Sequence, residues 1–176
     1  YRFHMPESSI VVQPGPADGA TGSASNRLQA AGLRTAIALF EQAAAAVPIP
    51  RSPRPIVVAD YGAATGHNSL LPIGAAIAVL RKRTRAEHSV LVTHTDVPEN
   101  DFTMLFRTLS DDPDTYLVRG GATFASAVGR SYLHQILPSN SVNLGWSSWA
   151  IQWLSRVPMP VADHVHVACS RDEQVR

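Results

Sequence analysis

The chain has 176 residues, of which 45% are hydrophobic and 16% are charged, and its formal net charge is +1 at pH 7. This length suits a single domain with a sizeable core, and the small net charge excludes the basic bias of many nucleic-acid-binding proteins. The single cysteine, Cys169, excludes an internal disulfide and a cysteine-based zinc cluster. No apolar run reaches the roughly 20 residues that span a bilayer, and no signal-peptide core is visible at the N-terminus. We therefore expect a cytoplasmic protein without a membrane span.

The first segment of the chain is rich in proline, glycine, serine and alanine. We expect residues 1–24 to be irregular, and residues 25–176 to form an α/β domain. Apolar residues among good helix formers predict a helix over residues 26–47, which Ser25 or Asn26 can cap. A proline-rich connector over residues 48–55 ends this helix.

Residues 56–68, IVVADYGAATGHN, predict a buried strand that leads into a tight turn. The strand ends at Asp60, and Gly62 and Gly66 allow the sharp turn and the close approach of a ligand. A helix is predicted to follow and to end at the basic run of residues 81–83. This is the first β-turn-α unit of a nucleotide-binding α/β sheet.

The spacing of the glycines narrows the ligand class. Neither the dinucleotide fingerprint G-x-G-x-x-G nor a phosphate loop ending in Gly-Lys-Ser/Thr is present. Gly-x-x-x-Gly after Asp60 instead resembles the first motif of class I S-adenosylmethionine-dependent methyltransferases, whose cofactor has no phosphates. A tight turn without a ligand is the structural alternative.

A second strand is predicted over residues 89–95 and ends at Asp96. A carboxylate at this position can accept hydrogen bonds from both hydroxyls of a ribose. An exposed turn aspartate is the alternative, but the neighbouring Asp60 turn favours the functional interpretation.

The remaining elements are predicted from shorter patterns. Residues 100–109 favour a helix with an Asn or Asp cap and a core face of Phe102, Leu105, Phe106 and Leu109. Residues 115–118 and 141–146 are expected to be strands, with a glycine loop over residues 119–123. A helix over residues 148–156 would place Trp149 and Trp153 on one face, either in the core or at the ligand-binding edge of the sheet. The scattered histidines predict no metal site.

Three segments in order resemble the salicylate and jasmonate type carboxyl methyltransferases, the SABATH family, and in particular its bacterial fatty-acid O-methyltransferases. VADYGAATGHNSL resembles the family pattern I-A-D-L-G-C-S-S-G-x-N-T/A-L, and TDVPENDFTMLFRTL resembles N-D-L-P-x-N-D-F-N-x-I-F-R-S-L. WSSWAIQWLSRVP resembles H-S-S-Y-S-L-x-W-L-S-x-V-P. The resemblance covers about residues 24–160 and implies a class I methyltransferase fold, a Rossmann-like sheet with flanking helices.

The resemblance implies S-adenosylmethionine as the cofactor and assigns residues to two sites. The implied cofactor-binding residues are Asn26, Asp60, Gly62, Gly66, Asn68, Asp96, Val97 and Ser126. The implied substrate-binding residues are Gln29, Trp149 and Trp153, of which Gln29 and Trp153 would position the acceptor carboxylate. A carboxylate is already ionised at neutral pH, so methyl transfer to it needs no general base. The expected substrate is a small-molecule acid with an apolar body, a fatty acid first and a small aromatic acid such as salicylate second.

Members of the family continue for roughly as many residues again, so the chain is expected to stop before the last strands and a helical cap. The fragment is then expected to have little activity alone, and its open sheet edge favours a homodimer. Two alternatives remain open. One is a catalytically silent binding module of the same fold, and the other is a different adenosine-nucleotide enzyme, such as a nicotinamide oxidoreductase, which the absent G-x-G-x-x-G disfavours.

Overall fold

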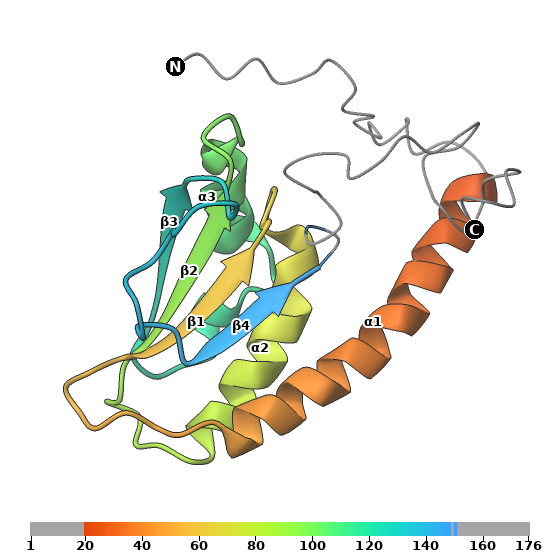
Figure 1. Cartoon of the computed structure of the whole chain (residues 1–176). Helices are drawn as coiled ribbons and strands as arrows, with labels where there is room; N and C mark the ends of the chain where they lie inside the picture. The colour runs from red at the N-terminus through yellow and green to blue at the C-terminus, as the bar shows by residue number, and fades with distance from the viewer. Residues whose placement is uncertain (1–19, 149, 151–176) are drawn as a thin grey trace, which may run out of the picture. The chain divides into compact units, whose positions relative to one another are not determined.

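The computed structural model describes the backbone of residues 20–148 and 150, and side chains from residue 33 onward (Figure 1). Helix α1 spans Ala20–Ala46, so residues 20–24 are helical where the sequence predicts an irregular segment. The chain divides into two compact units, residues 1–39 and 40–176. Only the last turns of α1 therefore belong to the unit that contains the sheet.

Four parallel strands form the sheet of the second unit. These strands are β1 (Ile56–Tyr61), β2 (Val90–Asp96), β3 (Thr123–Gly129) and β4 (Leu144–Ser147), in the spatial order β3-β2-β1-β4. The predicted α/β class and the first two strands are confirmed. Because the strands are parallel, their carboxyl ends share one edge of the sheet, where ligands of open α/β folds bind.

The third strand was placed wrongly from the sequence. Residues 116–118 form a 3-10 helix, η1 (Tyr116–Val118), and the strand is Thr123–Gly129, just after the predicted glycine loop. The buried Thr115 explains the 3-10 turn, because its hydroxyl donates to the Leu109 carbonyl at 2.7 Å and accepts from the Leu117 N–H. A side chain that satisfies local backbone groups in this way favours a turn over a strand.

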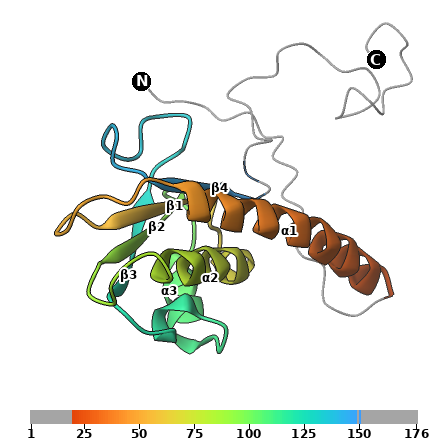
Figure 2. The same cartoon turned by 90° about the horizontal axis from the view of Figure 1, so that it is seen from below.

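Helices α2 (His67–Arg81) and α3 (Phe102–Asp111) lie on the same face of the sheet, together with η1 (Figure 2). The Asp101 carboxylate caps α3 by accepting from the Met104 N–H at 2.9 Å. Leu105 and Leu109 are buried as predicted, but Phe106 is 44% exposed and does not belong to the core. A helix that packs through a narrow stripe leaves the flanking position at the solvent.

The connection between β3 and β4 crosses the other face of the sheet (Figures 1 and 2). At the β4 edge, Trp146 packs on Phe40 from the end of α1, with ring centroids 5.0 Å apart. The helix predicted over residues 148–156 lies almost entirely outside the described residues. Within the described part of the chain, no helix is long and apolar enough to cross a membrane.

Candidate active site

The turn after β1 has the geometry for which its glycines were predicted. Gly62 and Gly66 have φ angles of 79° and 81°, which are left-handed values that favour glycine. A Cβ on Gly62 would lie 2.2 Å from the Cβ of Ala150, and one on Gly66 would lie 2.6 Å from Cδ1 of Leu105. A side chain at residue 62 would collide with Ala150, and one at residue 66 would require Leu105 to shift, so both positions favour glycine.

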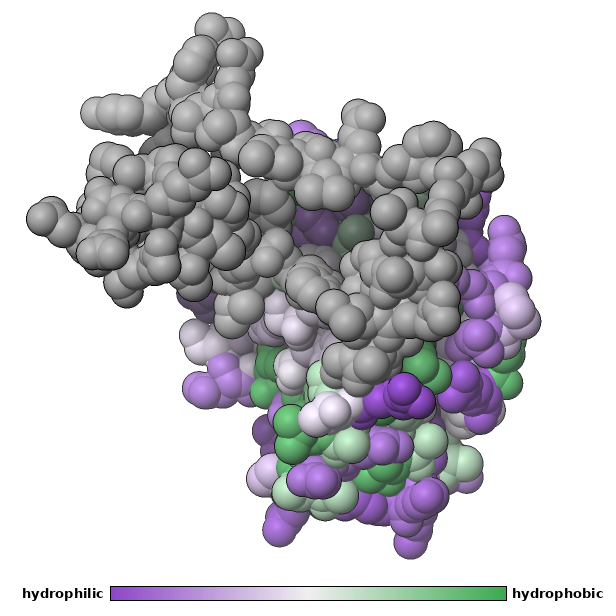
Figure 3. Space-filling model, turned by 90° about the vertical axis from the view of Figure 1, so that its right-hand side faces the viewer, coloured by the Kyte–Doolittle hydropathy of each residue, from purple (hydrophilic) through white to green (hydrophobic). Residues whose placement is uncertain are grey.

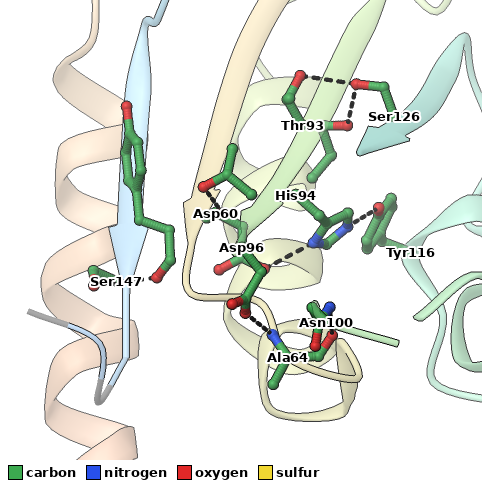
Figure 4. Close-up of polar contacts among 12 residues, drawn as sticks. Asp60, Ala64, Thr93, His94, Asp96, Asn100, Tyr116, Ser126 and Ser147 are labelled. Atoms are coloured by element: carbon green, nitrogen blue, oxygen red, sulfur yellow. Dashed lines mark hydrogen bonds and ion pairs between the residues drawn. The ribbon is translucent and has the colours of Figure 1, made fainter. Parts of the chain in front are cut away.

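Asp96 lies at the end of β2, directly beside this turn (Figure 4). Its Oδ2 accepts a hydrogen bond from the Ala64 N–H at 2.7 Å, and its Oδ1 accepts one from the Val97 N–H at 2.7 Å. Each carboxylate oxygen has two acceptor positions, so one on each oxygen remains for a ligand. Val97 is 42% exposed next to the half-buried carboxylate. Asp96, Val97 and the glycine turn are thus brought together as the sequence predicts.

Asn100 is a second anchor of the turn, whereas the sequence predicts for it only a role as a possible cap of the following helix. Its Nδ2 donates to the Ala64 carbonyl at 2.8 Å, while Asp101 caps α3. Ala64 has a φ of 47°, which is unusual for a residue with a side chain. Asp96 and Asn100 together bind both backbone groups of Ala64 and hold it in this conformation. In the sequence, the close spacing of Asp96 and Asn100 around Pro98 is the signal that could have indicated this shared role.

A buried hydrogen-bonded chain of side chains lies beside the turn, between the sheet and η1 (Figure 4). Asp60 Oδ2 lies 2.8 Å from His94 Nδ1, and His94 Nε2 lies 2.7 Å from the Tyr116 hydroxyl. The three side chains are at most 1% exposed. Asp60 and His94 are register partners on β1 and β2, so their side chains emerge on the same face.

The protonation state of Tyr116 in this hydrogen-bonded chain follows from its surroundings. Burial, and then the negative charge of Asp60, raise the pKa of Tyr116 well above its ordinary value of 10.0. Tyr116 therefore stays a phenol, and the two ring nitrogens of His94 link its hydroxyl to the Asp60 carboxylate. The Asp60 carboxylate is consequently held inside the protein, at the end of β1 where the turn begins. Neither His94 nor Tyr116 was singled out from the sequence.

Of the other predicted cofactor-binding residues, one lies next to the glycine turn and one lies away from it. Asn68 lies exposed in the first turn of α2, next to the glycine turn. Ser126 is not brought to the turn: it lies in the middle of β3, and its hydroxyl is 3.0 Å from that of Thr93. The register partner of Asp96 is Gly129, three residues further along β3.

The predicted substrate residues are not placed by the described structure. Asn26 and Gln29 lie on α1 in the first unit, and their side chains are outside the described ones. Trp149 and Trp153 are also outside the described residues. A cavity of about 470 Å³ does lie beside Tyr61, under the β3–β4 connection. No group of three or more metal-ligating side chains occurs among the described residues.

Comparisons with known proteins show which family and which individual proteins this chain is similar to. A family model described as SAM-dependent carboxyl methyltransferase matches residues 15–175. The chain is 33% identical over 138 residues to methyltransferase FUS9 of Gibberella moniliformis, covering 77% of this chain and 37% of that protein. It is 31% identical over 111 residues to salicylate carboxymethyltransferase of Clarkia breweri, covering 60% of this chain and 30% of the relative.

A solved structure of loganic acid methyltransferase with SAH matches the fold with a TM-score of 0.59 and 25% identity, covering 77% of this chain and 39% of that one. The chain thus spans between 30% and 39% of the length of these relatives. The family model is described as SAM-dependent, and the matched solved structure, which is similar in fold, contains SAH. Because the match of the family model covers most of the chain, the protein belongs to the family of SAM-dependent carboxyl methyltransferases.

Proposed function

We propose that the protein transfers the methyl group of S-adenosylmethionine to the carboxylate of a small apolar acid and so forms a methyl ester. One observation carries this proposal. The Asp96 carboxylate is fixed beside the glycine turn, at the carboxyl ends of two adjacent parallel strands. This geometry suits an adenosine ligand.

The residues of the turn fit the cofactor in distinct ways. The two open acceptor positions of Asp96 suit the two hydroxyls of a ribose, and Val97 offers an apolar surface to a base. Gly62 and Gly66 let the chain turn sharply, through their positive φ angles, between the strand end and the start of α2. When bound, the cofactor supplies the activated methyl group, and the task of this chain is to bind and orient it.

The acceptor side needs no acid or base from the protein. A carboxylic acid has a pKa of about 4 and is ionised at neutral pH, so orientation and exclusion of water are enough. We propose that the amide of Gln29 and the indole of Trp153 donate hydrogen bonds to this carboxylate and that Trp149 lines the acceptor site. Relatives named for farnesoic acid and for salicylate show that similar chains act on acids of different shape. A fatty acid is our first choice of acceptor, and a small aromatic acid is the second.

The cofactor assignment is tested by replacing Asp96. Asp96→Ala removes charge-assisted hydrogen bonds, each worth about 1.5–3 kcal/mol, so the affinity for S-adenosylhomocysteine should fall by at least about tenfold. Asp111→Ala is the matched control, because Asp111 is an exposed aspartate at the end of α3. Isothermal titration of both variants gives the comparison. Equal affinity of Asp96→Ala and the parent would refute the assignment.

The acceptor is tested by methyl transfer from radiolabelled cofactor to fatty acids of increasing chain length, to benzoate and salicylate, and to the matching fatty amides. Each buried methylene contributes about 0.8 kcal/mol, so affinity should rise severalfold per methylene until the site is full. Transfer to amides, or rates that ignore chain length, would contradict a site built for one carboxylate and an alkyl tail. Cofactor binding without transfer to any acid would favour the alternative of a silent binding module.

A further inference from the structure

A second concave site lies at the opposite end of the sheet from the glycine turn. It is a pocket of about 550 Å³ between the connection that precedes β1 and the connection that joins α2 to β2. Its polar lining residues are Ser52, Arg83, Thr84, Arg85, Glu87 and His88. Ligand pockets typically measure about 300–1,000 Å³, so the space suits a small molecule. The proposed transfer reaction makes no use of it.

The two connections carry a local excess of positive charge. Five cationic side chains of the connections accompany the single carboxylate of Glu87, and these are Arg51, Arg54, Lys82, Arg83 and Arg85; Arg81 ends α2 directly before them. The whole chain has a net charge of only +1. Hydrophilic residues project from the lower end of the molecule in Figure 3, which is the end that carries these connections in Figure 1. The helix dipole accounts for cations at the end of α2, but it does not account for Arg51, Arg54 or Arg85.

These cations lack acidic partners. Among the side chains that the structure describes, no arginine or lysine lies within 4.0 Å of a carboxylate, and the ion pairs there involve only histidine. Like charges that gather without counter-charges raise the local potential and attract anions. A basic face that served only solubility would be expected to alternate with acidic side chains.

Hydrogen bonds hold the pocket in shape before any ligand binds. Arg83 Nη1 donates to the Ala44 carbonyl at 2.7 Å, and Arg81 Nη1 donates to the His88 carbonyl at 2.6 Å. The Arg54 carbonyl accepts from His88 Nε2 at 3.1 Å, which ties the two connections together. The backbone carbonyl of Arg85 accepts from the His88 N–H at 3.1 Å, but its guanidinium makes no hydrogen bond with the described residues and is available to a ligand. The Thr84 hydroxyl already donates to the Leu80 carbonyl and is not a donor to the pocket.

We propose that this pocket binds a small phosphate-bearing anion, with Arg83 and Arg85 as its principal contacts. The guanidinium groups of Arg83 and Arg85 outnumber the one carboxylate of the lining, Glu87, and offer several N–H donors at one rim. A phosphate group, with about 1.5–2 charges and three acceptor oxygens, offers these donors more acceptors than a single carboxylate does. The concave shape favours a small ligand over an extended polyanion.

The test is a calorimetric titration of the whole chain with inorganic pyrophosphate at constant ionic strength, with citrate and a single-stranded oligonucleotide as comparisons. We expect saturable binding of one pyrophosphate and binding of citrate that is at least about fivefold weaker. Arg85→Gln should weaken pyrophosphate binding by about tenfold or more. Arg107→Gln is the matched control, because Arg107 is exposed on α3 and does not line the pocket, and it should change the affinity by less than about twofold.

Arg85 is exposed, so Arg85→Gln is expected to fold normally, and its affinity for S-adenosylhomocysteine should stay unchanged. That second readout separates a failure of this proposal from a failure of the proposed function. The absence of saturable binding, equal weakening by Arg107→Gln, or unchanged binding by Arg85→Gln would each overturn the site. Citrate that binds as tightly as pyrophosphate would overturn the phosphate assignment, and binding of the oligonucleotide alone would overturn the small-ligand assignment.

Discussion

The hydroxyl of Tyr116 has a measurable role in stability, because it is the outer group of the buried hydrogen-bonded chain that ends at Asp60. In Tyr116→Phe, His94 Nε2 loses its partner inside the protein, and an unsatisfied buried group costs about 1–3 kcal/mol. We expect the free energy of unfolding in urea to fall by that amount. Tyr61→Phe is the control, since the Tyr61 hydroxyl makes no hydrogen bond with the described residues. If the free energy of unfolding falls equally in both variants, the hydrogen bond between Tyr116 and His94 makes no specific contribution to stability.

Tyr116 also sets a limit on stability at high pH. Its pKa is raised in the folded protein, so above a pH of about 10 the unfolded chain loses this phenol proton while the folded chain keeps it. The folded state then binds more protons than the unfolded state, and the free energy of unfolding decreases as the pH rises. The Tyr116→Phe protein lacks this contribution, so its thermal midpoint should fall less than that of the parent between pH 9 and about pH 11. Parallel curves for the two proteins would contradict the assignment of a neutral, buried phenol.

Asn100 is expected to affect ligand binding through the conformation of Ala64. Removing its amide in Asn100→Ala frees the Ala64 carbonyl and leaves Asp96 as the remaining side-chain anchor of that residue. The affinity for S-adenosylhomocysteine should fall by a few-fold, because one hydrogen bond contributes about 0.5–1.5 kcal/mol. Asn140→Ala, in the connection before β4, is a control at another residue of positive φ. An unchanged affinity of Asn100→Ala would show that Asp96 alone fixes the turn.

The turn between β1 and α2 depends on glycine for two separable reasons, conformation and space. Gly66 has a positive φ and also lies against Leu105, whereas Gly120 has a φ of 84° with no atom within 4 Å of a built Cβ. Gly120→Ala should therefore cost only the left-handed strain, about 1–2 kcal/mol. Gly66→Ala adds a clash, so it should cost more and should also reduce cofactor affinity. Urea unfolding and calorimetry of both variants test this, and equal costs would exclude a role for the close contact.

The elements around this turn could be predicted from the sequence because their signals are local. A β-branched run, an acidic strand end and two glycines within 13 residues are enough to indicate β1, the turn and α2. Strand β3 was missed because FASAV has little β-branched character, and its strand conformation comes from pairing with β2, about 33 residues earlier. The Asp60–His94–Tyr116 chain was missed for the same reason, since its bonds join residues 34 and 22 positions apart.

At the scale of the whole molecule, the sheet has one well-covered face and one partly open face. Helices α2 and α3 pack on the first, whereas Phe124 on the second is 55% exposed and adjoins Leu91 and Val57 in register. This row of apolar side chains crosses three strands and ends at the β3 edge, which makes no strand pairing beyond β2 among the described residues. Exposed apolar rows next to an open edge favour association between chains.

The homodimer expected from the sequence would use this row. We predict that the protein self-associates in a concentration-dependent way in analytical ultracentrifugation, and that Phe124→Lys shifts it toward the monomer, because a charge cannot be buried without a partner. Phe106→Lys is the matched control, since Phe106 is a comparably exposed phenylalanine, 44%, on α3. A parent protein that stays monomeric at every concentration would refute the homodimer. The two substitutions add the same charge to different faces of the second unit. If they weaken the dimer equally, the dimer contact does not lie at Phe124.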